Sequence, residues 1–265
     1  MKRAAACVIF AVALLSIAQA QSARESVTFP SLDTNFKGQL TATLYRPAGP
    51  GPFPAMVLLH TCGGPQKHEQ DWGGWFAVNG YEALVVDSFG PRGVRNVCTG
   101  GPPNMRTRAF DAYGGLAFLR TRSEVDGARV GVIGWSHGAG TALVSDDKRF
   151  VDTVMQGASF RAAVALYPVC AMMSSVGVAA PLLVLLGSAD DWTPAEPCER
   201  DAAALAQRGY PVTAYTYPNA THAFDNPADR GTVHVGTNIY TMNFDPDATK
   251  DAHDRVKAFL AQNLK

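Results

Sequence analysis

Short, continuous runs of apolar residues alternate along this chain with segments in which apolar positions recur every three or four residues. Continuous runs of this length are typical of strands that are covered on both faces of a sheet. They predict strands at residues 55–59, 83–86, 129–133, 162–167, 182–186 and 212–217. A looser alternation at residues 37–45, which ends at Arg46 and Pro47, predicts an additional antiparallel strand before them.

Amphipathic segments fill the intervals between the runs. Besides a final helix near the carboxyl terminus, they predict helices at residues 69–79, 109–119, 137–144 and 198–207. Asp245 is suited to cap the final helix, and Pro246 to occupy its first position. Buried strands that alternate with amphipathic helices predict an α/β fold, with a mostly parallel central sheet and helices on both faces. Ligands of such sheets bind at the carboxyl ends of the strands, so reactive groups are expected directly after the apolar runs.

A G-x-S-x-G pentapeptide follows one of these runs at residues 134–138, with Ser136 at its centre. By itself the motif is weak, because it arises by chance in roughly one chain of this length in ten. Here a predicted strand precedes it and a helix of small residues follows it, which is the setting of a nucleophile elbow. A glycine-rich turn without chemistry is the alternative. The context favours Ser136 as a nucleophile.

A serine hydroxyl is a poor nucleophile unless a base accepts its proton. In folds with such an elbow, the acid and then the histidine follow the serine along the chain. Of the six histidines, His222 lies in the loop after the last predicted strand, where the base is expected. The acid is expected after the strand at residues 182–186, where position alone leaves both Asp190 and Asp191 open. The aspartate that is not the acid is expected to be a solvated carboxylate or a turn cap.

Backbone N–H groups are expected to stabilise the oxyanion. One is that of His137, which follows the nucleophile, and the other belongs to the loop at residues 60–64. The glycines of this loop allow its backbone to approach a substrate closely. We assign the second donor to Cys62, with Thr61 as the alternative.

The amino terminus predicts export. Lys2 and Arg3 precede an apolar run at residues 4–17, and small residues at positions 18 and 20 match a signal-peptidase site. We therefore expect a signal peptide at residues 1–20, a single domain at 21–265, and a secreted or periplasmic protein. An uncleaved amino-terminal anchor is the alternative, although the apolar run is short for a membrane span. No other segment is long and apolar enough to insert stably in a membrane.

Removal of the signal peptide leaves four cysteines: Cys62, Cys98, Cys170 and Cys198. In an oxidising compartment they suggest two disulfides, for which three pairings are possible. Zinc binding is disfavoured because no C-x-x-C pair is present and no histidines cluster beside the cysteines. We expect the pairs Cys62–Cys98 and Cys170–Cys198, because each would join loops that follow neighbouring strands at one edge of the sheet.

Composition narrows the classes of partner. The 265 residues carry 23 basic and 23 acidic side chains, and this balance argues against nucleic-acid binding, which usually requires a basic face. No cofactor or metal is expected: His68 and Glu69 lack the second histidine of H-E-x-x-H, and no G-x-G-x-x-G motif is present.

From about Leu44 to its end, the chain resembles the dienelactone hydrolase family of α/β hydrolases. The resemblance rests on residues 60–64, 87–93, 134–138, 187–190 with Pro194, and 221–224. It implies the α/β-hydrolase fold and a reaction at the carbonyl group of an ester. Family members place the acid three residues after the equivalent of Gly187 and four before that of Pro194, which selects Asp190. The founding members use a cysteine nucleophile and are cytoplasmic, so the resemblance does not extend to dienelactone as the substrate.

The combined interpretation is a carboxylic-ester hydrolase that forms an acyl-enzyme on Ser136 and acts on a small-molecule ester. An acyltransferase or small peptidase with the same residues, and a non-catalytic binding protein of the same fold, are the alternatives. The polar character of residues 225–243 favours small or soluble esters. Arg92 and Arg95 are candidates to bind a substrate carboxylate, or else solvated loop residues. Four aromatic residues are candidates to line an acyl pocket or else to pack in the core: Trp72, Trp135, Trp192 and Phe224.

Overall fold

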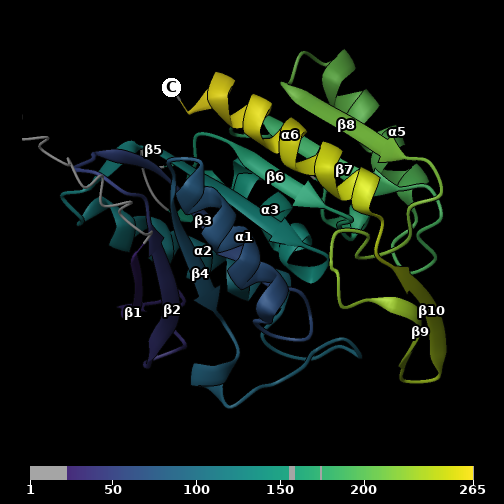
Figure 1. Ribbon diagram of the computed structural model, residues 1–265, viewed down its shortest axis with the longest axis horizontal. Coiled ribbons are helices and arrows are strands. Elements are labelled where there is room, and N and C mark those ends of the chain that lie inside the picture. Colours follow the sequence, from purple (N-terminus) through teal and green to yellow (C-terminus); the bar gives the residue numbers. More distant parts are fainter. Residues whose placement is uncertain (1–22, 155–158, 174, 265) are drawn as a thin grey trace, which may run out of the picture.

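A twisted central sheet runs through the molecule in a computed structural model that describes residues 23–154, 159–173 and 175–264 (Figure 1). Within these residues the sheet has eight strands, in the order β1-β2-β4-β3-β5-β6-β7-β8. The first three in this order pair antiparallel and the other pairs are parallel. The strands are β1 (Ala23–Pro30), β2 (Gln39–Arg46), β3 (Phe53–Leu59), β4 (Glu82–Asp87), β5 (Val125–Trp135), β6 (Ala163–Leu166), β7 (Leu182–Gly187) and β8 (Val212–Tyr217).

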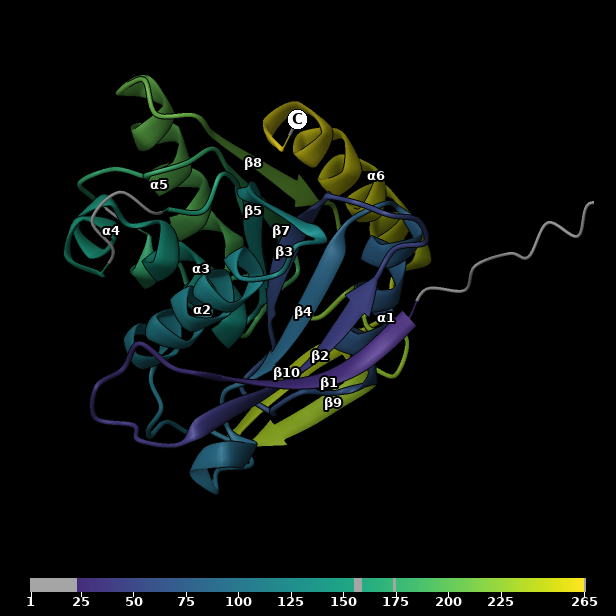
Figure 2. The same ribbon diagram turned by 90° about the vertical axis from the view of Figure 1, so that its left-hand side faces the viewer.

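Helices cover both faces of this sheet (Figure 2). On one face lie α1 (Lys67–Val78) and α6 (Pro246–Asn263). On the other face lie α2 (Met105–Arg120), α3 (His137–Asp146), α4 (Lys148–Val154) and α5 (Ala195–Gln207). The predicted α/β-hydrolase fold, with a mostly parallel sheet between two layers of helices, is thereby confirmed.

Two apolar cores explain why the central strands are continuous apolar runs. In β3, Ala55, Val57 and Leu59 pack into the core beneath α2 and α3. The intervening Met56 and Leu58 pack into the core beneath α1 and α6. Because successive side chains of a strand point to opposite faces, a strand between two helix layers must be apolar at every position.

Most predicted elements are present with shifted ends, and three were missed. Asp245 caps α6 by accepting the backbone N–H of Asp247 and Ala248, as predicted. The sequence analysis did not identify β1, α4 or the separate hairpin of β9 (Arg230–Val235) and β10 (Asn238–Asn243). Strand β1 lies at the sheet edge and buries little besides Val27 and Phe29, which leaves too short an alternation to recognise.

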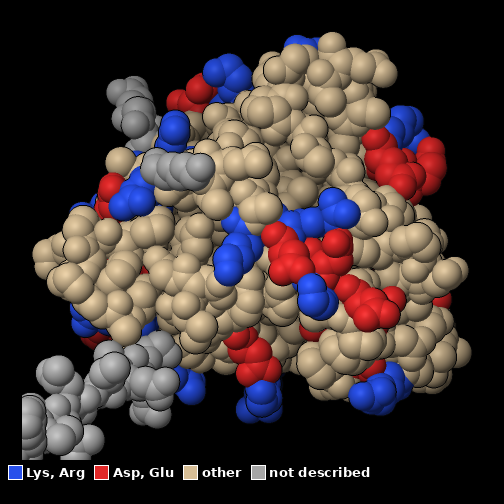
Figure 3. Space-filling view, turned by 45° about the horizontal axis from the view of Figure 1, so that its top comes forward, with Lys and Arg blue, Asp and Glu red and all other residues tan. Residues whose placement is uncertain are grey.

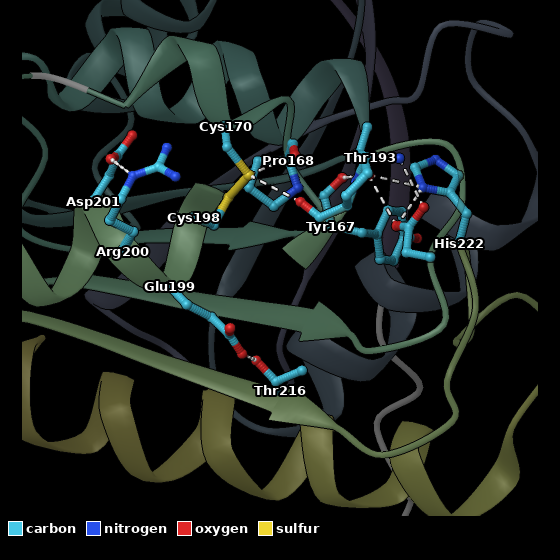
Figure 4. The surroundings of a disulfide bond; sticks show 12 residues. Tyr167, Pro168, Cys170, Thr193, Cys198, Glu199, Arg200, Asp201, Thr216 and His222 are labelled. Carbon is cyan, nitrogen blue, oxygen red and sulfur yellow. Dashed lines mark hydrogen bonds and ion pairs between the residues drawn. A yellow bond between two sulfur atoms is a disulfide. The ribbon is translucent and has the colours of Figure 1, made fainter. Parts of the chain in front are cut away.

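Both expected disulfides are present, Cys62–Cys98 and Cys170–Cys198, and the second is drawn in Figure 4. Two disulfides suit an extracellular or periplasmic protein. The predicted signal peptide lies outside the described residues, and none of the helices that the structure describes is long and apolar enough to cross a membrane. On the face in Figure 3, basic and acidic side chains stand in mixed groups rather than in a field of one sign.

Candidate active site

The candidate site lies where the order of the strands changes direction. Strand β3 pairs with β4 on one side and with β5 on the other, although β4 precedes β5 in the chain. The loops that leave the carboxyl ends of β3 and β5 therefore diverge and leave a crevice, as at the ligand sites of other open α/β sheets. The loop at residues 60–64 follows β3, and Ser136 follows β5.

The backbone around Ser136 forms a sharp turn between β5 and α3. Ser136 has φ 52° and ψ −114°, a strained combination for a residue with a side chain. A Cβ atom on Gly134 would collide with the backbone of Gly138, and one on Gly138 would collide with the carbonyl of Leu59. The two glycines of the pentapeptide are thus required by the packing of this turn.

Three predicted residues meet at this turn. The Nε2 atom of His222 lies 2.9 Å from Ser136 Oγ, and its Nδ1 atom lies 2.8 Å from Asp190 Oδ2. All three residues are buried, with 2 to 6% of their surface exposed. The imidazole ring of His222 packs between the rings of Tyr167 and Trp192, with centroids 4.8 and 4.9 Å away.

The two adjacent aspartates face different partners. Asp190 Oδ1 accepts the backbone N–H of Trp192 and Thr193, and its Oδ2 accepts the Thr193 hydroxyl besides facing His222. Figure 4 shows Thr193 directed toward His222. Asp191 is exposed and accepts the backbone N–H of Thr241 in β10, at 3.0 and 3.1 Å. Asp190 is thus built into the site, whereas Asp191 attaches the β9–β10 hairpin to it.

The loop after β3 distinguishes the two candidate oxyanion donors. The backbone N–H of Thr61 donates to the buried carboxylate of Glu69, 3.2 Å away. The N–H groups of Cys62 and His137 donate to no protein atom within the described part of the chain. Cys62 borders the same cavity as Ser136. The geometry therefore favours Cys62 over Thr61 as the free donor.

Arg108, which the sequence analysis did not single out, joins the segments that carry these donors. Its guanidinium is buried, donates to the His60 carbonyl at 2.8 Å, and donates to His137 Nδ1 at 2.7 Å. Burial lowers the pKa of Arg108 to about 10, so it stays charged at neutral pH. Burial and the charge of Arg108 lower the pKa of His137 to about 3. His137 is therefore neutral and carries its proton on Nε2.

Asp225, also missed, anchors the loop that carries His222. Its buried carboxylate accepts hydrogen bonds from His68, Trp72 and Trp135 at Oδ2, each 3.0 Å long, and from Tyr167 at Oδ1, 2.7 Å long. The sequence offered one clue to this role: Asp225 directly follows the apolar residues 223–224, in the loop after the last strand of the sheet.

The structure separates the candidate pocket residues that border the site from those that pack elsewhere. Trp192 borders the site, whereas three of the four aromatic candidates pack in the core: Trp72, Trp135 and Phe224. Arg92 makes two 2.8 Å hydrogen bonds to the buried Asp111 carboxylate and stacks on Phe36. Arg92 is thus neither solvated nor free to bind a substrate.

Comparisons with known proteins agree with this architecture. A sequence profile of the dienelactone hydrolase family matches residues 40–264. A protein of Azospirillum brasilense named for carboxymethylenebutenolidase activity is 28% identical over 243 residues, which cover 88% of this chain and 98% of that protein. A dienelactone hydrolase-like promiscuous phosphotriesterase from metagenomic libraries superposes with a TM-score of 0.70 at 18% identity, covering 92% of this chain and 100% of that one. Thermogutta terrifontis esterase 2, phosphorylated by paraoxon, gives a TM-score of 0.67 at 16% identity, covering 92% of this chain and 94% of that one.

Proposed function

The chain belongs to the dienelactone hydrolase family, and because a protein of similar fold is an esterase, we propose from this premise that the chain is a serine esterase. Ser136 attacks the acyl carbon of a small-molecule ester while His222 accepts the serine proton and passes it to the leaving alcohol. Asp190 holds the imidazole in the required tautomer. Water then releases the acyl group from Ser136, and the N–H groups of Cys62 and His137 stabilise each tetrahedral intermediate.

The observation that carries this proposal is the continuous chain of hydrogen bonds from Ser136 through His222 to Asp190, 2.9 and 2.8 Å long. A binding protein of the same fold would gain nothing from a serine held in a strained backbone conformation, which costs about 1–3 kcal/mol. The strain is accounted for if the hydroxyl must face both a base and two free N–H groups.

Labelling with paraoxon tests the proposal, since a protein of similar fold is phosphorylated by this reagent. We expect one diethylphosphoryl group on Ser136 by mass spectrometry and a parallel loss of p-nitrophenyl ester turnover. Ser136→Ala should take up no label and keep only residual turnover, while Ser136→Cys keeps slow turnover of activated esters. Ser123→Ala is the control, because Ser123 is exposed and precedes the opposite end of β5. Full activity in Ser136→Ala, with the label on another residue, would refute the proposal.

A further inference from the structure

Two cavities open at Ser136. The first, of about 330 Å³, is bordered by His222 and is called here the His222 cavity. The second, of about 520 Å³, is bordered by His137 and is called the His137 cavity. Besides Ser136, both include the Cys62–Cys98 disulfide and Trp192, which therefore stand between them.

The transfer of the proton from His222 to the leaving alcohol indicates which cavity holds the alcohol of the ester and which holds the acyl group. The leaving alcohol must receive its proton from His222, so it must lie on the side where that ring is accessible. His222 borders only the first of the two cavities. The acyl group stays on Ser136 after the alcohol has left, beside the N–H of His137, which borders only the second.

The chemistry of the His222 cavity indicates which alcohols it accepts. Its polar lining includes Gln66, Asn96, Asn226 and His234. Two carboxylates also border it, Glu69 and Asp229, whereas no Lys or Arg does so among the residues that the structure describes. His68 borders it too, but its Nε2 atom is paired with the Asp225 carboxylate. A negatively charged alcohol would meet two carboxylates of like charge there, without a lysine or arginine among the described lining residues to bind it.

The His137 cavity is mainly apolar. Val97, Val169 and the ring of Trp192 contribute to its lining. Met105 and Met172 also border it and converge over Gly140, where a Cβ atom would contact both side chains. Arg106 is the one charged side chain among the described residues that border it, and its guanidinium lies over the Phe150 ring, 5.0 Å from the centroid. Unbranched methionine side chains adapt to apolar groups of different shape.

We propose, on the basis of the serine esterase function above, that the His137 cavity holds a small apolar acyl group and the His222 cavity a polar alcohol without negative charge. The β9–β10 hairpin sets the choice of alcohol, because four of its strand residues and one residue of its turn border the His222 cavity and none borders the other: Val233, His234, Val235, Met242 and, in the turn, Gly236. The hairpin is held in place by Asp191, which accepts the N–H of Thr241, and by Tyr240, which stacks on Trp192 at 4.7 Å.

Esters of one acid with different alcohols pass through the same acyl-enzyme, which separates the two cavities kinetically. The wild type is compared with His234→Ala and Met172→Ala, neither of which removes a buried side chain. The substrates are butyrate esters of glycerol, choline and glycolate, and p-nitrophenyl esters of acetate, butyrate, hexanoate and succinate. Single-turnover measurements give the rate at which the butyryl-enzyme is hydrolysed.

We expect His234→Ala to change the ratio of kcat/KM between glycerol and choline butyrate roughly tenfold, the size of one lost pocket contact. It should leave acyl-chain preference and hydrolysis of the butyryl-enzyme unchanged. Met172→Ala should do the reverse, shifting the butyrate-to-hexanoate ratio and the hydrolysis rate while leaving the alcohol ratio unchanged. The wild type should prefer glycerol and choline butyrate to the glycolate ester, and butyrate to succinate, by about tenfold or more.

Exchanged effects of the two variants would overturn the assignment of the cavities. A preference for the glycolate or succinate ester would overturn the inferred charge and polarity of the substrate. Both results leave the serine esterase function intact, because they require a normal acyl-enzyme. If no acyl-enzyme formed on Ser136, the proposed function itself would fail, and this inference with it.

Discussion

Replacing Asp225 with asparagine should destabilise the fold much more than it slows the reaction. The carboxylate accepts three N–H groups at Oδ2, from His68, Trp72 and Trp135, and the Tyr167 hydroxyl at Oδ1. An asparagine that keeps its oxygen toward the three N–H groups must turn its NH₂ group toward the Tyr167 oxygen. The number of contacts is then almost preserved, but the negative charge is lost.

The magnitude follows from the four hydrogen bonds. Bonds to a charged group are worth roughly 1.5–3 kcal/mol each, against about 0.5–1.5 for neutral ones. Four bonds that each lose about 1 kcal/mol give about 4 kcal/mol. A second estimate does not use the hydrogen bonds: removing one partner of a buried ion pair costs about 3–5 kcal/mol. We therefore expect the free energy of unfolding to fall by about 3–5 kcal/mol.

The pair of His68 and Asp225 also makes this difference depend on pH. Burial would lower the pKa of His68, but the Asp225 carboxylate outweighs it and raises that pKa above 6.5. Burial would raise the pKa of Asp225, but His68 and the other donors hold it below 3.8. The stability from this pair is thus complete between pH 3.8 and 6.5. It is lost as the pH rises through the higher pKa or falls through the lower one.

Urea denaturation followed by far-ultraviolet circular dichroism, at about pH 5.5 and 8.5, measures this effect. Asp225→Asn should lose the stated free energy at the lower pH and less at the higher, with turnover reduced by less than about tenfold. Asp190→Asn should instead lower turnover by about four orders of magnitude, a loss of activity far larger than that expected for Asp225→Asn. Asp191→Asn, at an exposed carboxylate, is the matched control. A large loss of turnover in Asp225→Asn without loss of stability would refute the reasoning, since Asp225 would then act on His222 as the acid.

Three further predictions concern His137, Arg108 and the amino terminus. Because the pKa of His137 is about 3, the unfolded chain binds a proton before the folded one does, so stability should fall as the pH drops from 6.5 toward 3, by up to about 4 kcal/mol. Denaturation of His137→Gln over this range should show a shallower slope. Arg108→Gln should lower kcat about 10- to 100-fold with little change in KM, since it loosens both segments that carry the proposed oxyanion donors; steady-state kinetics with a circular-dichroism check measures this. Amino-terminal sequencing of exported protein should begin at Gln21, and a start at Met1 would contradict cleavage.

Local patterns explain why much of the architecture was predictable from sequence. The apolar runs of β3 and β7 follow from burial on both faces of the sheet, because each residue of the run packs into one core or the other and must therefore be apolar. The elbow could be recognised because the glycines at residues 134 and 138 are required by contacts within the same turn and with the adjacent strand end. The choice of Asp190 needed a resemblance to a family, because its neighbour Asp191 has the same chemistry and nearly the same position.

Features that depend on distant partners could not be predicted in this way. The apolar face of the β9–β10 hairpin, with Val233, Val235, Tyr240 and Met242, is short and only partly buried, and the hairpin is fixed by Asp191 and Trp192 from another loop. Arg108 contacts atoms 29 and 48 residues away, and Asp225 contacts one 157 residues away. Whether a charged residue is buried depends on the partners that compensate its charge, and the order of residues along the chain does not show which distant residues these are.

The free N–H groups of Cys62 and His137 explain why a charged arginine is buried behind the site. Most backbone N–H groups have a hydrogen-bond acceptor, so the two segments would be expected to shift until each of these donors found one in the protein. Arg108 opposes such a shift because it binds both segments. Its guanidinium donates to the carbonyl of His60, two residues before Cys62, and to the ring of His137 itself. The strained Ser136 is fixed in a similar way, by its N–H to the Leu166 carbonyl and by the Gly140 N–H to its own carbonyl. These N–H groups face no protein acceptor in the described part of the chain because their surroundings are held rigidly, so in the proposed reaction an oxyanion would meet them without further rearrangement.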